Sequence, residues 1–378
     1  MVAPEPLRIS PSRCLGTRRV VGACTAVFAA TLAIAPATAT PAVAASTTYA
    51  MTDLGSLGYG VSYAFGINAS AQITGRSYLT QTAPVSGCPP RHTCVAHLAH
   101  AFSWSAGTMG DLGSLGGIYS EGQAINSTGD VAGYSNLSNS STYHAFLVHN
   151  GHMSDLGTLV PGGFSEAYGL NNFDEIVGYG SGASGQHAFF DTGGKMSALP
   201  DLSSYGGGYS SASSINNLHQ AVGSSDNASG SGHAVLWSNG NVTDLGTLGG
   251  SQSAAYAIND AGQVVGWAHT QSEATHAFLY TGGKMTDLGA YNIDTVGEAI
   301  NSAGVLVGQT YGVDGSGNPF YHAFIYSGGA FQDLNNLIKA GSGWELTDAT
   351  AINDNGQIAA NGYSATTGKT HAFLLNPM

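Results

Sequence analysis

The chain has 378 residues and a formal net charge of −13 at pH 7, with 23 acidic against 10 basic side chains. An acidic surface repels phosphate backbones and anionic lipid headgroups, which argues against nucleic acid or a membrane surface as a partner. Only 9% of the residues are charged, well below the usual quarter, and glycine occurs 55 times. The composition therefore indicates a turn-rich β-protein with a neutral polar surface.

The first 45 residues have the pattern of a secretory signal peptide. Four arginines precede the apolar run VVGACTAVFAATLAIA at residues 20–35, and the small residues of the triplet 42–44 match a cleavage site. The run is too short to be a membrane span. We therefore expect removal of residues 1–45 and an extracellular protein of residues 46–378, exported by the general route or, given the pair Arg18 and Arg19, by the twin-arginine route.

Two cysteines, Cys88 and Cys94, remain in the exported part, in the loop sequence CPPRHTC. Two close cysteines in one loop of an exported chain typically form a disulfide. A zinc site with His92 and His97 is the alternative, although the spacing matches no standard zinc motif. We therefore predict a disulfide and no metal site in this loop.

Three motifs recur seven times each in the same order along the chain. Asp-Leu and a following Gly or its substitute begin at Asp53, Asp111, Asp155, Asp201, Asp244, Asp287 and Asp333. Ile-Asn or its variant ends at Asn68, Asn126, Asn171, Asn216, Asn259, Asn301 and Asn353. His-Ala-Phe or its variant begins at His100, His144, His187, His233, His276, His322 and His371. Most intervals between equivalent positions are 42–49 residues, a period typical of a β-propeller with one four-stranded blade per repeat.

The fifth repeat shows the four expected strands most clearly. SAAYAIN (253–259) and QVVGWA (263–268) are joined by a turn that Gly262 closes. HAFLY (276–280) and MTDLG (285–289) then form a hairpin around Gly282 and Gly283. In the register that this turn sets, Tyr280 faces Met285 and Phe278 faces Asp287.

The two ends of the exported chain complement each other. An isolated fourth strand, YAMTDLG (49–55), begins it, and three strands without a fourth end it. Placing the first strand in the last blade removes the open sheet edges. We therefore predict an all-β fold, a seven-bladed β-propeller of four-stranded blades whose N-terminal strand closes the last blade.

The repeats resemble those of the HAF-repeat family of extracellular bacterial proteins. The resemblance covers essentially the whole exported chain and rests on DLGTLGG, AIN-x-x-G-Q-V-V-G and HAFLY. The family is defined by its repeat and its secretion signal. The resemblance therefore implies an extracellular location and no particular reaction.

The recurring histidines and carboxylates are groups that serve in catalysis and metal binding, but their repetition favours a structural role. His276 lies diagonally across the expected hairpin from Asp287, within hydrogen-bonding reach. Catalysis would need one pair to differ from the others, yet all seven are equivalent. We predict that each pair braces its hairpin, through Asp287 in the fifth repeat and through His100, His144, His187, His233, His276, His322 and His371.

Positions that differ between repeats are better candidates for a functional site. A hydroxyl residue stands five residues before each Ile or Leu of the Ile-Asn motif. These residues either bond local backbone groups or form a ring at the mouth of the central channel that a propeller would have. They are Ser62, Ser120, Ser165, Ser210, Ser253, Thr295 and Thr347. The next position carries Glu121, Glu166 and Asp348 in repeats expected to lie on one arc. Such carboxylates could bind a cation, orient sugar hydroxyls, act as an acid–base pair or be solvated charge.

Aromatic side chains precede the innermost strands, on the side where the long second-to-third-strand loops 76–99 and 308–321 should emerge. They are Tyr59, Tyr119, Phe164, Tyr205, Tyr209 and Tyr291. Aromatic rings beside hydroxyls and carboxylates suit a glycan or an extended peptide, and packing within the loops is the alternative. We predict as ligand-binding residues Tyr63, Glu121, Glu166, Tyr209, Tyr291, Glu298 and Asp348.

These features predict a secreted, monomeric, non-catalytic binding module for a polysaccharide or a surface protein. One alternative is a polysaccharide lyase or hydrolase that uses Glu121, Glu166 or Asp348, and another is a structural surface protein. No cofactor is expected. The nearest approach to a calcium loop is GVDGSGNP (312–319), where Asp314 and Asn318 provide a single acid.

Overall fold

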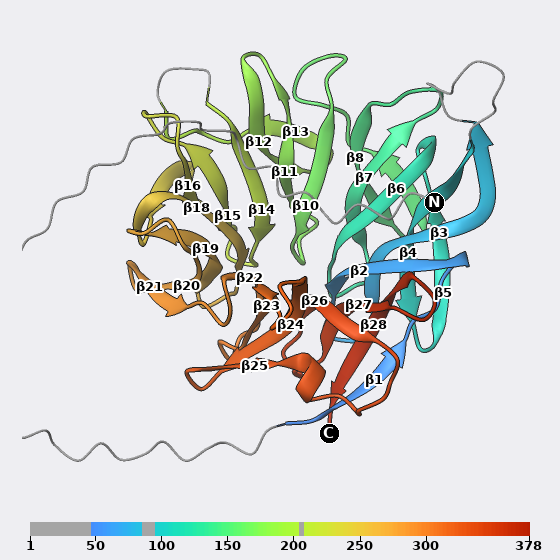
Figure 1. Cartoon of the computed structure of the whole chain (residues 1–378). Helices are drawn as coiled ribbons and strands as arrows, with labels where there is room; N and C mark the ends of the chain where they lie inside the picture. Colours follow the sequence, from blue (N-terminus) through green and yellow to red (C-terminus); the bar gives the residue numbers. More distant parts are fainter. Residues whose placement is uncertain (1–46, 85–94, 204–207) are drawn as a thin grey trace, which may run out of the picture. The chain divides into compact units, whose positions relative to one another are not determined.

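The computed structural model describes residues 47–84, 95–203 and 208–378 (Figure 1). The predicted signal peptide and the predicted Cys88–Cys94 disulfide lie outside the described residues. Apart from one short 3-10 helix, η1 (Leu334–Asn336), the regular elements of the described parts are β-strands. The all-β prediction is therefore confirmed, and we number the repeats from one to seven by their His-Ala-Phe motifs in chain order.

Repeats three to six each form one antiparallel sheet of four consecutive strands. Repeat three contains β10 (Ser165–Leu170), β11 (Ile176–Gly182), β12 (Gly185–Thr192) and β13 (Lys195–Ala198). Repeat four contains β14 (Ser210–Ile215), β15 (Ala221–Asp226), β16 (Gly232–Ser238) and β17 (Asn241–Gly246). Repeat five contains β18 (Gly249–Ile258), β19 (Val264–Thr270), β20 (Thr275–Thr281) and β21 (Lys284–Gly289). Repeat six contains β22 (Asp294–Ile300), β23 (Leu306–Val313), β24 (Pro319–Ser327) and β25 (Ala330–Asp333).

Repeats one and two have the same antiparallel order, and a single parallel bridge between Ala99 and Tyr119 joins them into an eight-stranded sheet. Repeat one contains β2 (Gly58–Ile67), β3 (Ile73–Pro84), β4 (Val95–Ser105) and β5 (Thr108–Gly113). Repeat two contains β6 (Gly116–Ile125), β7 (Val131–Leu137), β8 (Tyr143–His149) and β9 (His152–Asp155).

The remaining sheet combines the two ends of the exported chain. Repeat seven supplies β26 (Glu345–Ile352), β27 (Ile358–Ser364) and β28 (Lys369–Pro377), and the fourth strand is β1 (Tyr49–Asp53). The pairing of β1 with β28 is antiparallel over five residues. The first strand thus joins the last sheet, as the incomplete repeats at the two ends predict.

The strand register follows from the turn residues. Phe278 faces Asp287 and Tyr280 faces Met285, which confirms the predicted register of this hairpin. Each first strand carries a bulge opposite the second strand, and in the first six repeats the second strand has a glycine beside the bulge, where repeat seven has Ala360. A Cβ atom added to Gly266 would lie only 2.0 Å from the carbonyl oxygen of Ala254, so a larger residue does not fit.

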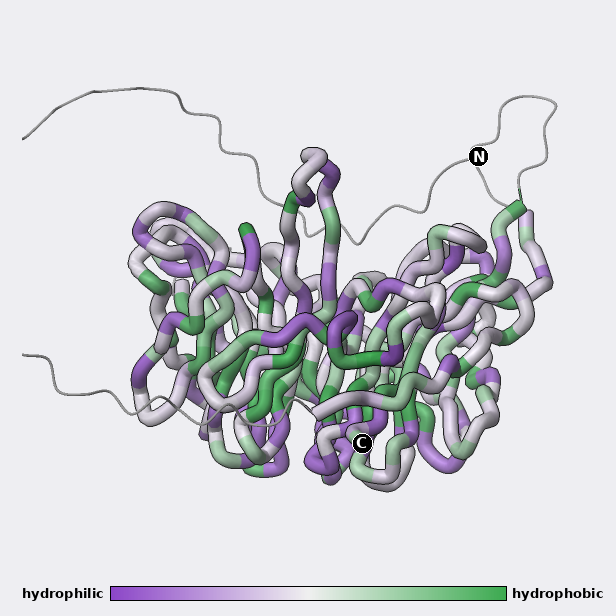
Figure 2. The backbone as a smooth tube through the Cα atoms, turned by 60° about the horizontal axis from the view of Figure 1, so that its bottom comes forward, coloured by the Kyte–Doolittle hydropathy of each residue, from purple (hydrophilic) through white to green (hydrophobic). Residues whose placement is uncertain are grey.

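The hydrophobic core lies between neighbouring sheets. The phenylalanine of the His-Ala-Phe motif is fully buried in six repeats, and Val235 occupies this position in the fourth. One core cluster combines Ile73 and Phe102 of repeat one with Leu374 of repeat seven. Figure 2 shows the hydrophobic segments running along the strands, whereas the turns are mainly hydrophilic. Each sheet therefore depends on its neighbours for burial of its apolar side chains.

Candidate functional site

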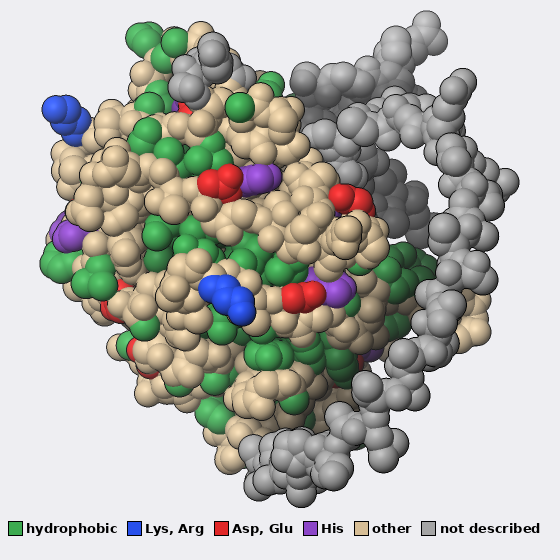
Figure 3. Space-filling view, turned by 90° about the vertical axis from the view of Figure 1, so that its left-hand side faces the viewer, with side chains coloured by type: hydrophobic (Ala, Val, Ile, Leu, Met, Phe, Trp, Pro, Cys, Tyr) green, Lys and Arg blue, Asp and Glu red, His purple; other side chains and the backbone are tan. Residues whose placement is uncertain are grey.

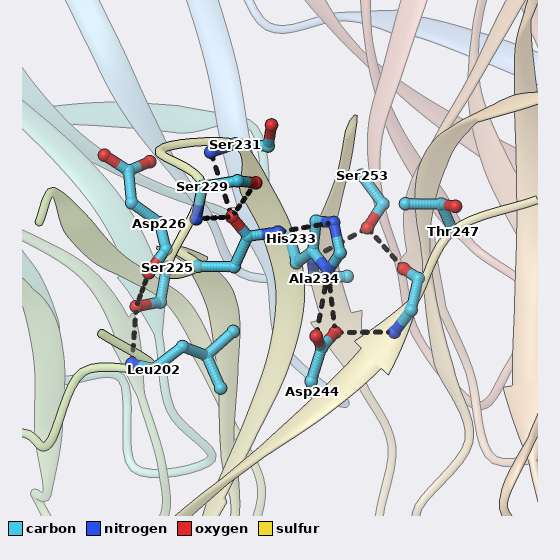
Figure 4. A network of polar contacts seen from close by, with 12 residues as sticks. Leu202, Ser225, Asp226, Ser229, Ser231, His233, Ala234, Asp244, Thr247 and Ser253 are labelled. Atoms are coloured by element: carbon cyan, nitrogen blue, oxygen red, sulfur yellow. Dashed lines mark hydrogen bonds and ion pairs between the residues drawn. The ribbon is translucent and has the colours of Figure 1, made fainter. Parts of the chain in front are cut away.

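The seven histidines of the His-Ala-Phe motifs all contact an aspartate of the Asp-Leu motifs. The Nδ1 atoms lie 2.6–3.1 Å from carboxylate oxygens, and in five repeats the aspartate also accepts the backbone N–H of the following glycine. Figure 4 shows one such pair, His233 and Asp244. Figure 3 shows histidines beside carboxylates at the surface of the sheets. The pairs are His100–Asp111, His144–Asp155, His187–Asp201, His233–Asp244, His276–Asp287, His322–Asp333 and His371–Asp53.

Five of the seven hydroxyl residues before the Ile-Asn motifs, all of them serines, accept a backbone N–H of a neighbouring repeat. Ser120 is buried, accepts the backbone N–H of Ala101 at 2.8 Å and donates to the carbonyl of Gly113 at 2.5 Å. Its partners belong to the preceding repeat, and Ser253 repeats the arrangement with Ala234 (Figure 4). These contacts favour the interpretation that the serines satisfy backbone groups between repeats, whereas Thr295 accepts the backbone N–H of Tyr291 and Thr347 donates to Asp348.

Glu121 lies inside a polar network that spans repeats one and two. Its carboxylate is 2.5 Å from Nη1 of Arg76, and it also accepts hydrogen bonds from Tyr119, Gln123 and Tyr134. Burial alone would lower the pKa of Arg76, but the Glu121 carboxylate and nearby tyrosines raise it, so the guanidinium stays charged. Since Glu121 is only 4% exposed and its charge is neutralised, it is not free to bind or cleave a ligand.

Arg76 was not among the residues that the sequence singled out. Arg76 lies on β3 and faces Tyr63 of β2, at the position where the second strand of each repeat varies most. Its guanidinium lies 4.7 Å from the centre of the Tyr63 ring. A basic residue is rare in this chain, which has 10 in all. That rarity, together with the variable position, was the signal that could have identified it.

Glu166 lies beside a hollow between repeats two and three. Its carboxylate accepts the hydroxyls of Tyr168 at 2.9 Å and Tyr179 at 2.7 Å. Burial, followed by the charge of Glu166, raises the pKa of both tyrosines, which keeps their hydroxyls protonated. The hollow has a volume of about 430 Å³ and is lined by Ser141, Thr142, Tyr143, Gly162, Gly163, Phe164, Glu166, Tyr179, Ser181 and Gln186.

The hollow combines the two kinds of loop that were expected on one side of the molecule. Gly163 and Phe164 belong to the segment before β10, whereas Thr142 and Gln186 lie where second and third strands connect. Tyr134 stands next to it, 6.0 Å from the ring of Tyr168 between centroids. The tyrosines therefore connect the hollow to the Glu121 network.

Asp348 lies with Glu298 and not with the other two carboxylates. It accepts hydrogen bonds from Thr347 at 2.7 Å and Asn361 at 2.8 Å. Burial and then the charge of Asp348 raise the pKa of Glu298, and burial raises the pKa of Asp348 itself. Asp348 therefore has hydrogen-bond partners different from those of Glu121 and Glu166, and its neighbouring carboxylate is Glu298.

The other aromatic candidates do not line the hollow. Tyr209 is 61% exposed, and Tyr291 is 37% exposed and stacks on Phe331 at 6.0 Å between ring centroids. Tyr59 stacks on His97 at 3.7 Å. Tyr205 lies outside the described residues. Of the aromatic loop residues, Phe164 is the one that the structure places in the hollow.

The loop around Asp314 is closed by its own hydrogen bonds. Oδ1 of Asp314 accepts the backbone N–H groups of Ser316 and Asn318, both at 2.8 Å, and Oδ2 accepts the Asn318 amide at 3.2 Å. A calcium ion would have to displace these donors, since the loop offers one carboxylate only. These hydrogen bonds show that the segment 314–318 is a turn stabilised by the Asp314 side chain.

No family model matches the chain, and no curated protein is similar to it. Among solved structures it is similar to TolB from Acinetobacter baumannii, with 11% identity and a TM-score of 0.41 over 75% of this chain and 60% of TolB. It is also similar to XC5397 from Xanthomonas campestris, described as a gluconolactonase, with 9% identity and a TM-score of 0.37 over 88% of this chain and 91% of the other. These similarities carry no conclusion about the activity of this chain.

Within the residues that the structure describes, no helix has the length and apolar character that a membrane crossing requires.

Proposed function

We propose that this chain is a secreted member of the HAF-repeat family whose sheets are the seven blades of a β-propeller closed by β1. Two observations support the closure. The Asn353 side chain of repeat seven donates to the carbonyl of Asn68 in repeat one at 3.0 Å, and Asn361 donates to the carbonyl of Ala64 at 3.2 Å. A cavity of about 310 Å³ is also lined by the Ile-Asn motif, or its Leu-Asn variant, of every repeat.

On this scaffold the hollow beside Glu166 is the proposed binding site, and its ligand is a neutral polysaccharide of the cell surface or the environment. The observation that carries this proposal is the composition of the lining, which combines aromatic rings with hydroxyl and amide groups around one carboxylate. Aromatic faces pack against the apolar faces of sugar rings, and the polar groups can bond sugar hydroxyls. A surface protein is the other partner that such a lining would accept.

A glycan array followed by calorimetric titration of the best neutral oligosaccharide tests this assignment. We expect Phe164→Ala and Glu166→Gln to weaken binding by about tenfold or more, because each removes one contact worth roughly 1.4 kcal/mol. Tyr291→Ala is the matched control, since this aromatic residue lies outside the lining, and it should leave affinity unchanged. Equal binding by all variants, or binding to a protein partner but to no glycan, would overturn the glycan assignment.

Glu298 and Asp348 support a second candidate function, a polysaccharide lyase or hydrolase. Burial and the neighbouring carboxylate raise the pKa of Glu298, so a protonated acid stands near a second carboxyl group. An acid beside a base is the pairing that glycosidic bond cleavage uses. Turnover of a polysaccharide that disappears in Glu298→Gln, with the melting temperature preserved, would favour the enzyme. If neither binding nor turnover is found, a structural surface protein is favoured.

A further inference from the structure

The turn between the first and second strands brings two positions of neighbouring repeats together. In four repeats a glutamine follows the turn, and in three of these its side chain lies against the turn glycine of the next repeat. Oε1 of Gln72 lies 3.0 Å from the Cβ position of Gly129, and Oε1 of Gln263 lies 3.5 Å from that of Gly304. At these junctions a neutral amide therefore faces bare backbone.

The junction between repeats two and three differs at both positions. Asp130 replaces the glutamine, and Asp174 replaces the glycine at a backbone φ of +57°, which disfavours residues with a side chain. Two carboxylates thus meet at this junction, whereas the junction between repeats three and four, which also departs at both positions, has one carboxylate, Glu175, paired with His219. Like charges at close range repel each other, so a positive charge between the two carboxylates would stabilise the arrangement.

A third departure from the repeat lies at the same place. His149 occupies the last position of a third strand, where the corresponding residues elsewhere are serine, threonine or asparagine, as in Ser105, Thr281 and Asn376. Its Nδ1 atom lies 3.1 Å from Oδ1 of Asp130 and 3.9 Å from Oδ2 of Asp174. The three potential ligand atoms all lie within 4.8 Å of one another.

The remaining carboxylate oxygens are held by neighbouring donors. Oδ2 of Asp130 accepts the hydroxyl of Thr128 at 2.6 Å, and Oδ1 of Asp174 accepts the Asn126 amide at 2.9 Å. In six of the seven repeats the corresponding asparagine donates to the backbone of an adjoining repeat, whereas Asn126 donates to carboxylates. These bonds orient the free oxygens toward His149, as outer hydrogen bonds orient the ligands of metal sites.

We propose that Asp130, His149 and Asp174 bind a divalent transition-metal ion of the zinc class. Zinc bonds of about 2.0–2.1 Å in tetrahedral geometry place neighbouring ligand atoms roughly 3.3 Å apart. The separations of 3.1 and 3.9 Å from Nδ1 come close to that value. Imidazole nitrogen suits zinc, whereas calcium requires six to eight oxygen ligands. Three protein ligands leave a fourth position open to water or to a group of a partner molecule.

Zinc titration of the metal-stripped, exported chain tests the proposal, followed by calorimetry and by thermal unfolding. We expect one zinc ion per chain, a melting temperature higher by a few degrees in excess zinc, and no effect of calcium. Asp174→Gly restores the residue that four other repeats have at this positive φ, so it should fold normally and bind zinc at least tenfold more weakly. His149→Ser, which restores a residue found in other repeats, should have the same effect.

His219→Gly is the matched control. His219 stands at the same turn position of repeat four, with φ of +59°, and its Nδ1 lies 2.7 Å from a single carboxylate, Glu175. This variant should bind zinc as the unaltered chain does. Failure of the unaltered chain to bind zinc, or undiminished affinity in both Asp174→Gly and His149→Ser, would overturn the proposal and leave His149 as an ion-pair partner only.

Discussion

At the scale of single residues, the seven His–Asp pairs show how one interaction is used at seven equivalent places. In the fifth repeat Nδ1 of His276 is 2.8 Å from Asp287, and the same carboxylate accepts the N–H of Gly289 at 2.7 Å. The aspartate thus holds the start of the connection to the next sheet, and the histidine holds the aspartate. Nothing in this geometry distinguishes one pair as a reaction centre.

We expect His276→Ala to lower the melting temperature by about 1–3 °C, because a partly exposed pair contributes roughly 0.2–1 kcal/mol. Ligand binding should not change. Because the pairs lie in different repeats, the decreases in melting temperature caused by His144→Ala and His276→Ala should add in the double variant. Calorimetric melting of the single and double variants checks this. Loss of ligand binding at unchanged stability would contradict the role of a brace.

His322 makes one pair sensitive to pH. Its hydrogen bond to Asp333, opposed by burial and supported by Glu345, raises the pKa of the imidazole above its usual value. Stability from such a group is fully present below the unfolded pKa of about 6.5 and is lost as the pH rises through the higher folded value. The melting temperature of the unaltered chain should therefore exceed that of the His322→Gln variant by more at pH 6 than at pH 8.5. Glu345→Gln should reduce the difference, and an equal difference at both pH values would contradict this assignment.

At the scale of elements, β1 is the strand whose absence should matter most. Tyr49 and Leu54 at its two ends are buried, and Asp53 pairs with His371 on β28. Deleting residues 46–57 should lower the melting temperature by at least about 10 °C, since two large side chains lose burial worth roughly 1.5–3 kcal/mol each. The exposed edge of β28 should also promote dimers, visible by size-exclusion chromatography. A synthetic peptide of residues 47–57 should restore part of the stability, and a deletion without effect would contradict the role of β1.

The elements were largely predictable from the sequence, whereas the site was not. The turn at Gly282 and Gly283 sets the hairpin register locally, so pattern alone was sufficient there. The burial of Glu121 depends on Arg76, which comes from the preceding repeat, and equal spacing along the chain does not report such a partner. Glu166 was identified as a candidate, but the hollow beside it arises from loops of two repeats whose conformations the sequence does not specify.

At the scale of the whole molecule, the junction between repeats two and three differs from the other junctions at two places. The hollow near Glu166 lies where the loops before the first strands meet the second-to-third-strand loops. Asp130 and Asp174 lie at the turns that end the first strands, at the opposite end of β10. At both places polar residues differ from those at the equivalent positions of other repeats, whereas the buried phenylalanines of the His-Ala-Phe motifs are kept. The proposed binding site and the proposed metal site therefore both lie where polar residues of repeats two and three depart from the repeat, on a core that stays the same.

The proposed closure of the ring makes a prediction about the order of the chain. Thr48 and Met378 are joined by a backbone hydrogen bond of 2.9 Å, so a short Gly-Ser linker can connect the original ends. A permuted chain that begins at Gly283 and ends at Gly282 would then place β21 at its N-terminus and β20 at its C-terminus. These strands would pair as β1 and β28 do in the natural order.

We expect this permuted chain to fold, with a circular dichroism spectrum like that of the natural order and a melting temperature within about 5 °C of it, because every sheet keeps its partners. The natural order carrying the same linker at its C-terminus is the control for the linker itself. A permuted chain that stays unfolded while this control folds would show that the pairing of the first strand with the last is special to the seventh repeat. Such a result would contradict a closed ring of equivalent sheets, in which any repeat can hold the two ends of the chain.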